Sequence, residues 1–331
     1  MKKPLFSVIV PVKKINQFIT KEIAAALENQ TLSSWELIII PDKFEKGDLK
    51  ETDLIKIVES GDVPPGKKRN LGVSQARGKY LAFLDDDAYP NRYWLENAES
   101  ILKRKVVGGV CGPGITPSTD SFLCQLSGWV WASFWGSGGA GRYRGWPEKE
   151  QEVDDYPSFN LIIKKKIFKE TSGFDNYFWP GEDTKLCEEI VYKLKKRIVY
   201  SPQVLVYHHR RPVLKAHLRQ LGRYGHQRGY FARILPRTSL RIGYLLPPLF
   251  FLGLFLGPVL YFLLRWPLLI WIYFISLGLY LMGLVYTFFE VFQKSKRFWL
   301  SLLVLPVILV SHLYNGMMFL RGFLGKKGLA S

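Results

Sequence analysis

The sequence predicts an α/β domain with a mostly parallel sheet, followed by C-terminal transmembrane helices. The first part is indicated by β-rich runs that alternate with segments of helical spacing. The second is indicated by a change of composition, because the chain is almost continuously apolar and aromatic from Ile242 onward. We therefore expect a folded domain over residues 1–210, a basic amphipathic interfacial helix region over 211–241 and transmembrane helices over 242–325.

The first elements of the chain alternate between strand and helix. Residues 7–12 (SVIVPV) form a short β-rich run, and residues 15–30 carry apolar side chains at helical spacing. Residues 35–40 (WELIII) have the pattern of a second buried strand. A strand, a helix and a strand in this order form a βαβ unit, which favours a parallel sheet with helices on its faces.

The later elements of the domain follow the same logic. Residues 67–76 are expected to be helical, and residues 80–84 (YLAFL) form a third strand that ends directly on Asp85. The pattern is irregular from 108 to 145, where the glycine-rich stretch 136–141 predicts a mobile loop flanked by tryptophans. Order returns at 160–168, and a helix is expected over 184–195.

Three apolar segments are long enough to span a bilayer, at about 242–264, 268–289 and 299–320. The start of the chain lacks the apolar core of a signal peptide, so we expect the first domain to stay cytoplasmic. Three spans would then put Arg321, Lys326 and Lys327 outside, against the positive-inside rule. A re-entrant or interfacial position for one segment therefore stays open.

The positive charge is concentrated in one stretch of the chain. The net charge is +18, yet residues 1–190 carry 26 basic and 27 acidic side chains, whereas 191–241 carry 13 basic and none acidic. An excess just before apolar segments favours anionic lipid over nucleic acid. The three cysteines form no CxxC pair, so neither a zinc site nor a disulfide framework is indicated.

Asp85, Asp86 and Asp87 form an acidic triplet at a strand end. Ligands of α/β sheets bind at the carboxyl ends of strands, where Asp42 also lies, after the second strand. Three like charges at one place are unfavourable unless a cation offsets them, and oxygen ligands suit Mg²⁺ or Mn²⁺. The alternative is a solvated acidic turn before Pro90.

An ordered set of motifs resembles the family 2 glycosyltransferases of the GT-A fold. The set comprises SVIVPV, Asp42, GKKRNLG at 66–72, ARGKY at 76–80, FLDDDAYP at 83–90, Asn160, GFD at 173–175, GED at 181–183 and YHHRR at 207–211. The resemblance covers about residues 5–230. It implies a nucleotide-sugar-binding domain with a central mixed, mostly parallel sheet.

The resemblance also implies roles for single residues. Pro11 and Asp42 would line the nucleotide pocket, with Lys68 and Arg69 near the nucleotide or diphosphate. Asp85 would contact ribose or metal, Asp86 would lie on the nucleotide-sugar side, and Asp87 would ligate the metal. His208, slightly preferred over His209, would be a third metal or diphosphate contact.

Glu182 and Asp183 form the pair that would include the general base. The resemblance implies that Asp183 takes the proton from an acceptor hydroxyl in an inverting reaction. Independently, a carboxylate beside another carboxylate, partly removed from water, gains basicity. The alternative is ordinary stabilisation of a helix N-terminus by acidic side chains.

Residues 220–224 (QLGRY) resemble the QxxRW signature of membrane-embedded polysaccharide synthases. Arg223 could hold a diphosphate and Tyr224 could stack on an acceptor sugar. We place Trp135 and Asn160 on the acceptor side too, and leave out the segment around Pro180. Residues 214–234 also have the composition of an interfacial helix, and both interpretations can hold.

The function that these features favour is transfer of a sugar, with inversion, from a nucleotide diphosphate sugar to a hydroxyl of a lipid-linked acceptor. The cofactor would be Mn²⁺ or Mg²⁺, and the protein would be integral to the membrane, with its catalytic domain at the cytoplasmic face and no nucleic-acid partner. A polyprenyl-phosphate glycosyltransferase, a processive polysaccharide synthase and a non-catalytic nucleotide-sugar-binding membrane protein are the alternatives. The oligomeric state stays open.

Overall fold

The computed structural model describes residues 3–44, 49–139 and 141–325. It divides into two compact units. The sheet unit comprises the chain up to Ile115 together with Pro147–His209, and the helical unit comprises Thr116–Trp146 together with the chain from Arg210 onward.

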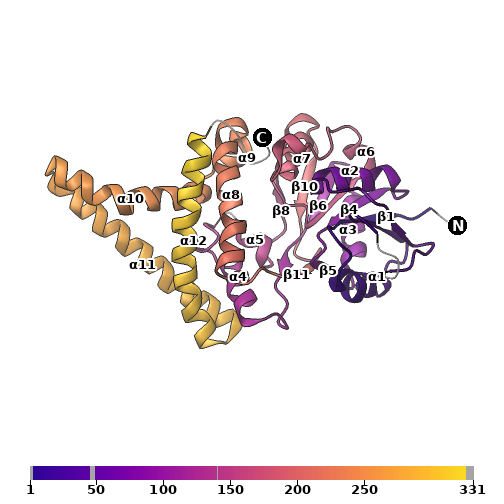
Figure 1. Ribbon diagram of the computed structural model, residues 1–331, viewed down its shortest axis with the longest axis horizontal. Helices are drawn as coiled ribbons and strands as arrows, with labels where there is room; N and C mark the ends of the chain where they lie inside the picture. The colour runs from indigo at the N-terminus through magenta and orange to yellow at the C-terminus, as the bar shows by residue number, and fades with distance from the viewer. Residues whose placement is uncertain (1–2, 45–48, 140, 326–331) are drawn as a thin grey trace. The chain divides into compact units, whose positions relative to one another are not determined.

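Eight strands of the described residues form one mixed sheet in the sheet unit, in the order β3-β2-β1-β4-β9-β6-β10-β8 (Figure 1). The pairs β1–β2, β1–β4, β2–β3 and β6–β10 are parallel, whereas β9 runs antiparallel to β4 and β6, and β8 antiparallel to β10. The strands are β1 Phe6–Pro11, β2 Trp35–Ile40, β3 Ile55–Ile57, β4 Tyr80–Leu84, β6 Val107–Cys111, β8 Gln151–Val153, β9 Asn160–Lys164 and β10 Arg197–Tyr200. The predicted α/β class and mixed, mostly parallel sheet are confirmed.

A second, three-stranded sheet lies next to the carboxyl end of β4 in the chain. Its order is β5-β11-β7, with β5 Ala88–Pro90, β7 Gly114–Ile115 and β11 Val206–His208. The antiparallel pairing of β11 with β5 sets His208 opposite Ala88. A residue late in the chain is thereby brought beside the acidic triplet.

The central strands are buried at every position, which explains their continuous apolar runs. Every residue of β1, β2 and β4 is buried, as expected for parallel strands whose two faces are covered by other elements. The helical segments of this unit are a π-helical turn Ile19–Ile23, α1 Ala24–Glu28, α2 Pro65–Gln75, α3 Trp94–Leu102, α6 Lys165–Phe168, a 3₁₀ turn Asn176–Phe178, α7 Glu182–Glu188 and a π-helical turn Glu189–Lys193.

The prediction of irregular structure over 108–145 is wrong. This stretch contains most of β6, all of β7, α4 Phe122–Ala132 and α5 Arg142–Gly145. The strand β6 was hidden because it uses glycine for close approach, since a Cβ on Gly108 would lie 2.8 Å from Lys196 Cβ. The glycine-rich stretch itself forms turns, with Gly138 and Gly139 at positive φ, and Ala140 lies outside the described residues.

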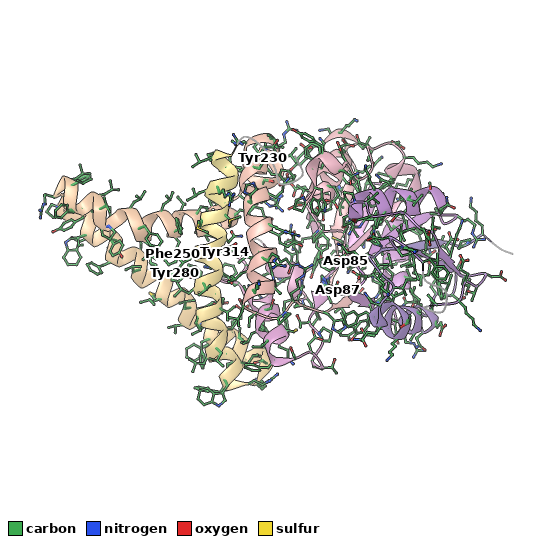
Figure 2. All side chains as sticks on the ribbon, viewed as in Figure 1. Asp85, Asp87, Tyr230, Phe250, Tyr280 and Tyr314 are labelled. Carbon is green, nitrogen blue, oxygen red and sulfur yellow. The ribbon has the colours of Figure 1, made fainter. Side chains whose placement is uncertain are left out.

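The three predicted apolar segments are the long helices of the helical unit. By length and composition, each is able to cross a membrane. The helices of this unit are α4, α5, α8 Lys215–Ile234, α9 Pro236–Ser239, α10 Ile242–Leu264, α11 Pro267–Ser295 and α12 Phe298–Leu324. Figure 2 labels Phe250 and Tyr280, whose rings stack between α10 and α11 with centroids 3.9 Å apart.

Glycines allow α8 to pack closely against α12. A Cβ on Gly229 would lie 2.0 Å from the backbone oxygen of Phe319, and one on Gly222 would lie 2.5 Å from the ring of Tyr314. His217 of α8 adds polar contacts, because its ring nitrogens lie 2.8 Å from Ser127 Oγ and 3.0 Å from Ser311 Oγ. The buried face of α8 is therefore covered by protein.

Candidate active site

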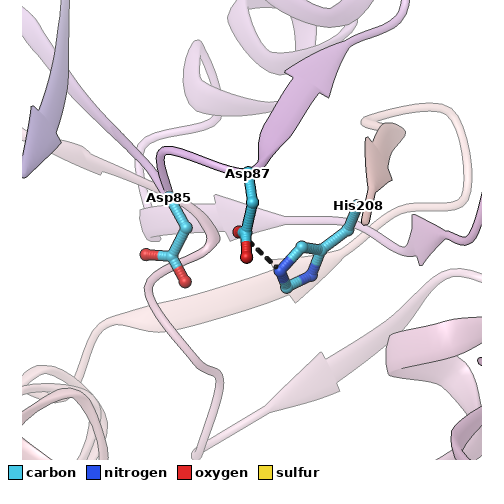
Figure 3. Close-up of side chains that lie close together, drawn as sticks. All are labelled: Asp85, Asp87 and His208. Atoms are coloured by element: carbon cyan, nitrogen blue, oxygen red, sulfur yellow. Dashed lines mark ion pairs between the residues drawn. The ribbon is translucent and has the colours of Figure 1, made fainter. Parts of the chain in front are cut away.

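The acidic triplet occupies the turn between β4 and β5, and His208 ends the paired strand β11. Ligand atoms of Asp85, Asp87 and His208 all lie within 4.8 Å of one another. His208 Nε2 is 3.0 Å from Asp87 Oδ1, and the close-up in Figure 3 shows the three side chains facing one another. The strand pairing, more than the local sequence, creates this cluster.

The chemistry of this cluster fits a divalent cation. Two carboxylates and an imidazole suit Mn²⁺, and the carboxylates alone suit Mg²⁺. His208 Nδ1 is buried without a hydrogen-bond partner, although the residue itself is 8% exposed. Both carboxylates stay about one-third exposed, so an ion can reach them from solvent.

Asp86 has a different environment from its two neighbours. Its carboxylate accepts a hydrogen bond of 2.8 Å from Asn16 Nδ2. Burial, with the nearby charges of Asp87 and Asp85, raises the pKa of Asp86 to about 7. Asp86 is thus engaged with the segment after β1, and it is not part of the Asp-Asp-His cluster.

Arg69 of α2 joins the Asp-Asp-His cluster to α7. It donates to Asp85 Oδ1 over 2.8 Å and to Glu182 Oε1 over 3.1 Å, and its side chain is only 6% exposed. These contacts occupy both terminal nitrogens of the guanidinium. Arg69 is predicted to lie near the nucleotide or diphosphate. In the structure its guanidinium binds two carboxylates.

Asp183 lies in the first turn of α7, next to Glu182. Its carboxylate accepts backbone hydrogen bonds from Ser158 over 3.1 Å and from Thr184 over 2.8 Å. Burial, and then the charges of Glu182 and Asp155, raise its pKa to about 7, although Arg69 and the Ser158 bond act in the opposite direction. A carboxyl with this pKa is suited to accept a proton near neutral pH.

The residues predicted to bind the nucleotide meet at the ends of β1 and β2. Lys68, which is 3% exposed, forms an ion pair with Asp42 and donates to the carbonyl oxygen of Val12. Pro11 is the last residue of β1 and is buried. The structure thus brings Asp42, Lys68 and the end of β1 together.

The residues predicted for the acceptor side are dispersed. Asn160 is 0% exposed, and its amide bonds Trp94, Gly112 and Val204 inside the sheet unit. This amide therefore has no exposed surface that an acceptor could contact. Its role is to hold strands and loops together.

Trp135, Arg223 and Tyr224 belong to the helical unit. Trp135 packs against α11, where its ring centroid lies 5.8 Å from that of Tyr280. Arg223 and Tyr224 are exposed on α8, and the ring of Tyr224 lies 6.2 Å edge-on from Trp131. These residues share one unit, separate from the unit that holds the acidic cluster.

Sequence reasoning missed several contacts around the acidic cluster. His209, the neighbour of His208, binds Glu22 over 2.8 Å and stacks on Phe18. Asp155 accepts from Thr184 over 2.8 Å and so supports the start of α7. These partners come from segments far apart in the chain, and no local pattern predicts them.

Comparison with known proteins decides the family. The family model described as "Glycosyl transferase family 2" matches residues 7–172. The chain belongs to glycosyl transferase family 2. It is therefore a transferase of the glycosyltransferase class, and the resemblance inferred from the motifs is confirmed.

Individual relatives are distant from this member of glycosyl transferase family 2. A pre-mycofactocin glycosyltransferase of Mycobacterium tuberculosis is 25% identical over 165 residues, which cover 49% of this chain and 33% of that protein. A glucosyl-dolichyl phosphate glucuronosyltransferase of Haloferax volcanii is 24% identical over 202 residues, covering 54% and 60%. The chain thus spans less than two thirds of the length of either relative.

One solved structure shares the fold along almost the whole chain. It is the mannosyltransferase PcManGT from Pyrobaculum calidifontis, in complex with GDP-Man and Mn²⁺. The TM-score is 0.54 at 15% identity, and the match covers 99% of this chain and 89% of that one. The similarity confirms the GT-A fold.

Proposed function

We propose that the protein transfers a sugar, with inversion, from a nucleotide diphosphate sugar to a hydroxyl of a lipid-linked acceptor at the cytoplasmic face of a membrane. The observation that carries the proposal is the connection of two sites through one side chain. Arg69 binds both Asp85, in the Asp-Asp-His cluster, and Glu182, beside the raised-pKa carboxyl of Asp183. One buried side chain thus connects the candidate metal site with the segment that contains the candidate base.

The Asp-Asp-His cluster would hold Mn²⁺ or Mg²⁺. A bound divalent ion neutralises charge on the diphosphate that leaves with the nucleoside. Asp87 and His208 are proposed as direct ligands, because they face each other at 3.0 Å, and Asp85 as the ligand that Arg69 orients. The Mn²⁺ in the complex of PcManGT supports this assignment.

Asp183 is proposed as the general base. The acceptor O–H gives its proton to the Asp183 carboxylate while the oxygen attacks the anomeric carbon, and the bond from that carbon to the diphosphate oxygen breaks. Attack opposite the leaving group inverts the anomeric configuration. The backbone bonds from Ser158 and Thr184 hold the carboxylate in position for this step.

Asp42, Lys68 and Pro11 are proposed to line the nucleotide pocket. Lys68 is almost fully buried and paired with Asp42, so the pair orients the Asp42 carboxylate at the carboxyl end of β2. Ligands of α/β sheets bind at that edge. Asp86 and Arg69 support this side of the site through Asn16 and Asp85.

A lipid-linked acceptor is supported by the long apolar helices that follow the catalytic domain. One relative is named for a glucosyl-dolichyl phosphate, a sugar attached to a lipid phosphate. Tyr224 and Trp135 are proposed for the acceptor side, because both belong to the unit that contains these helices, and Arg223 of the same unit is proposed to bind the diphosphate of the nucleotide sugar.

The experiment uses the full chain in detergent with Mn²⁺, a panel of nucleotide diphosphate sugars and lipid extract. We expect nucleoside diphosphate release that depends on extract and is lost in Asp183→Asn. The lipid product identifies the acceptor by mass spectrometry. The proposal would be refuted if wild type and Asp183→Asn released nucleoside diphosphate equally fast. It would also be refuted if the sugar were transferred only to water.

A further inference from the structure

We propose that α12 lies along the membrane surface, with one apolar face in the lipid, and that only α10 and α11 cross the bilayer, as a hairpin. This inference goes beyond the proposed function and does not depend on it. It concerns the helical unit alone, and its partner is a phospholipid bilayer with anionic headgroups.

The first observation is that α8 runs alongside the C-terminal half of α12. Successive contacts join His217 to Ser311 and Gly229 to Phe319, so the two helices run in the same direction. A Cβ on Gly322 would lie 1.8 Å from the backbone oxygen of His226, so the backbones almost touch. Whatever surrounds this half of α12 must also surround α8.

The second observation is the charge on the outer face of α8. Lys215, Arg219 and Arg223 follow one another at intervals of four residues, so they share one face of the helix, and all three are exposed. Each such charge at the centre of a bilayer costs about 2.5–3.5 kcal/mol. If α12 crossed the bilayer, it would carry this face of α8 into hydrocarbon.

The N-terminal half of α12 is also covered on one side. Leu300, Val304 and Ile308 are buried in a cluster with Leu126 and Val130 of α4. A further contact joins Arg297 to Gln125 at the start of α12. Protein therefore covers one side of α12 along both of its halves.

The opposite face of α12 is apolar and exposed. Six exposed apolar positions recur at intervals of three, four or seven residues, which places them on one stripe: Trp299, Leu303, Pro306, Val310, Met317 and Leu324. The exposed Arg321 lies on the same face in the last turn of the helix, where its long side chain can reach the headgroups. A helix with protein on one face and such a stripe on the other fits the boundary between headgroups and acyl chains. Trp299 suits that boundary in particular.

The helices α10 and α11 have different surroundings. In an apolar 18-residue stretch of each helix, 6% is buried in α10 and 11% in α11, against 33% in α12. Figure 1 shows the two helices leaving α12 on the side opposite α8 and converging at the turn that joins α10 to α11. The 23 residues of α10 reach about 35 Å, enough for a hydrocarbon core of about 30 Å.

The charge distribution agrees with two spans. With an even number of spans, Lys294 and Arg297 before α12 and Arg321 at its end lie on the same side as the basic stretch 191–241. Arg265, at the hairpin turn, is then the basic residue on the far side. This arrangement satisfies the positive-inside rule, which three spans violate. The basic residues gathered on one side of the membrane also favour an anionic membrane surface.

Cysteine labelling in sealed vesicles tests this topology. In a Cys124→Ser background, in which Cys111 and Cys187 are buried, single cysteines are placed at four exposed positions: Lys103→Cys, Trp266→Cys, Gln293→Cys and Arg321→Cys. We expect a membrane-impermeant maleimide to label positions 103, 293 and 321 from one side and 266 from the other. Labelling of 321 from the side of 266, or of 266 from the side of 103, would overturn the proposal.

A depth measurement gives an answer that does not rely on side accessibility. A fluorophore on Leu303→Cys, Val310→Cys or Met317→Cys is quenched by lipids that carry nitroxides at known depths. We expect one shallow depth for all three and a greater depth for Leu256→Cys of α10. A profile in which position 310 is deepest and approaches that of 256 would show that α12 crosses, and so refute the proposal.

Discussion

Arg69 Nη1 lies 3.1 Å from Glu182 Oε1, across 113 positions of sequence. The other terminal nitrogen of Arg69 binds Asp85, so one cation serves two carboxylates. Glu182 and Arg69 are both buried, whereas Asp85 is one-third exposed. Removal of the guanidinium would leave a buried carboxylate without its partner.

We expect Arg69→Met to lower the free energy of unfolding by about 3–5 kcal/mol, the usual cost of an unpaired buried charge. The measurement is denaturant unfolding of the purified protein in detergent. The matched control is Arg104→Met, because the Arg104–Glu150 pair is about half exposed on both sides and should contribute less than about 1 kcal/mol. Equal stability of the two variants would show that the Arg69 contacts do not hold the site together.

Activity is expected to rise with pH through the pKa of Asp183. Burial and neighbouring carboxylates raise that pKa to about 7, and a base must be ionised to accept a proton. The value of kcat/KM should therefore be low at pH 5.5, increase through neutrality and level off above it. Asp183→Asn should be slower by about 10²–10⁴-fold, with no such rise.

The pH profile is measured at saturating Mn²⁺ with wild type, Asp183→Asn and the exposed control Glu150→Gln. The control should follow the wild-type curve. A flat wild-type profile between pH 5.5 and 8 would contradict the assignment of Asp183 as the base.

Local patterns in the sequence predicted those parts of the fold in which the polarity of each side chain matches its burial. The strands β1, β2 and β4 are buried throughout, so their continuous apolar runs were sufficient. The strand β6 was missed because Gly108 and Gly109 lack the side chains that form a pattern. Its glycines serve contacts with other strands, which only the fold specifies.

The candidate site divides in the same way. Asp85 and Asp87 follow directly from the end of β4, whereas His208 reaches them through the pairing of β11 with β5. The resemblance to a family selected His208, but residue patterns alone could not separate it from His209. Arg69 was expected near a nucleotide, because its charge is visible in the sequence and its two partners are not.

The two adjacent histidines provide a test of the metal site. His208 faces Asp87, whereas His209 binds Glu22 and stacks on Phe18. We expect His208→Gln to raise the Mn²⁺ concentration needed for half-maximal activity. Loss of an outer-sphere partner of a metal site typically costs about 10–100-fold in metal affinity, and loss of a direct ligand should cost no less. His209→Gln should leave that concentration unchanged, and excess EDTA should abolish wild-type activity.

Binding of Mn²⁺ measured by electron paramagnetic resonance gives the same comparison without turnover. Wild type and His209→Gln should bind the ion alike, and His208→Gln more weakly. Equal binding by all three would exclude His208 as a ligand.

The glycines of α8 and α10 should respond differently to the same substitution. A Cβ on Gly229 would lie 2.0 Å from the backbone oxygen of Phe319, whereas Gly253 of α10 has no atom within 4 Å of its added Cβ. Overpacking costs about 1–3 kcal/mol, so Gly229→Ala should lower the midpoint of thermal unfolding in detergent. Gly253→Ala removes only the poor helix propensity of glycine and should be neutral or stabilising by up to about 1 kcal/mol. A Gly229→Ala protein as stable as Gly253→Ala would mean that α8 does not pack on α12 as closely as the contacts indicate.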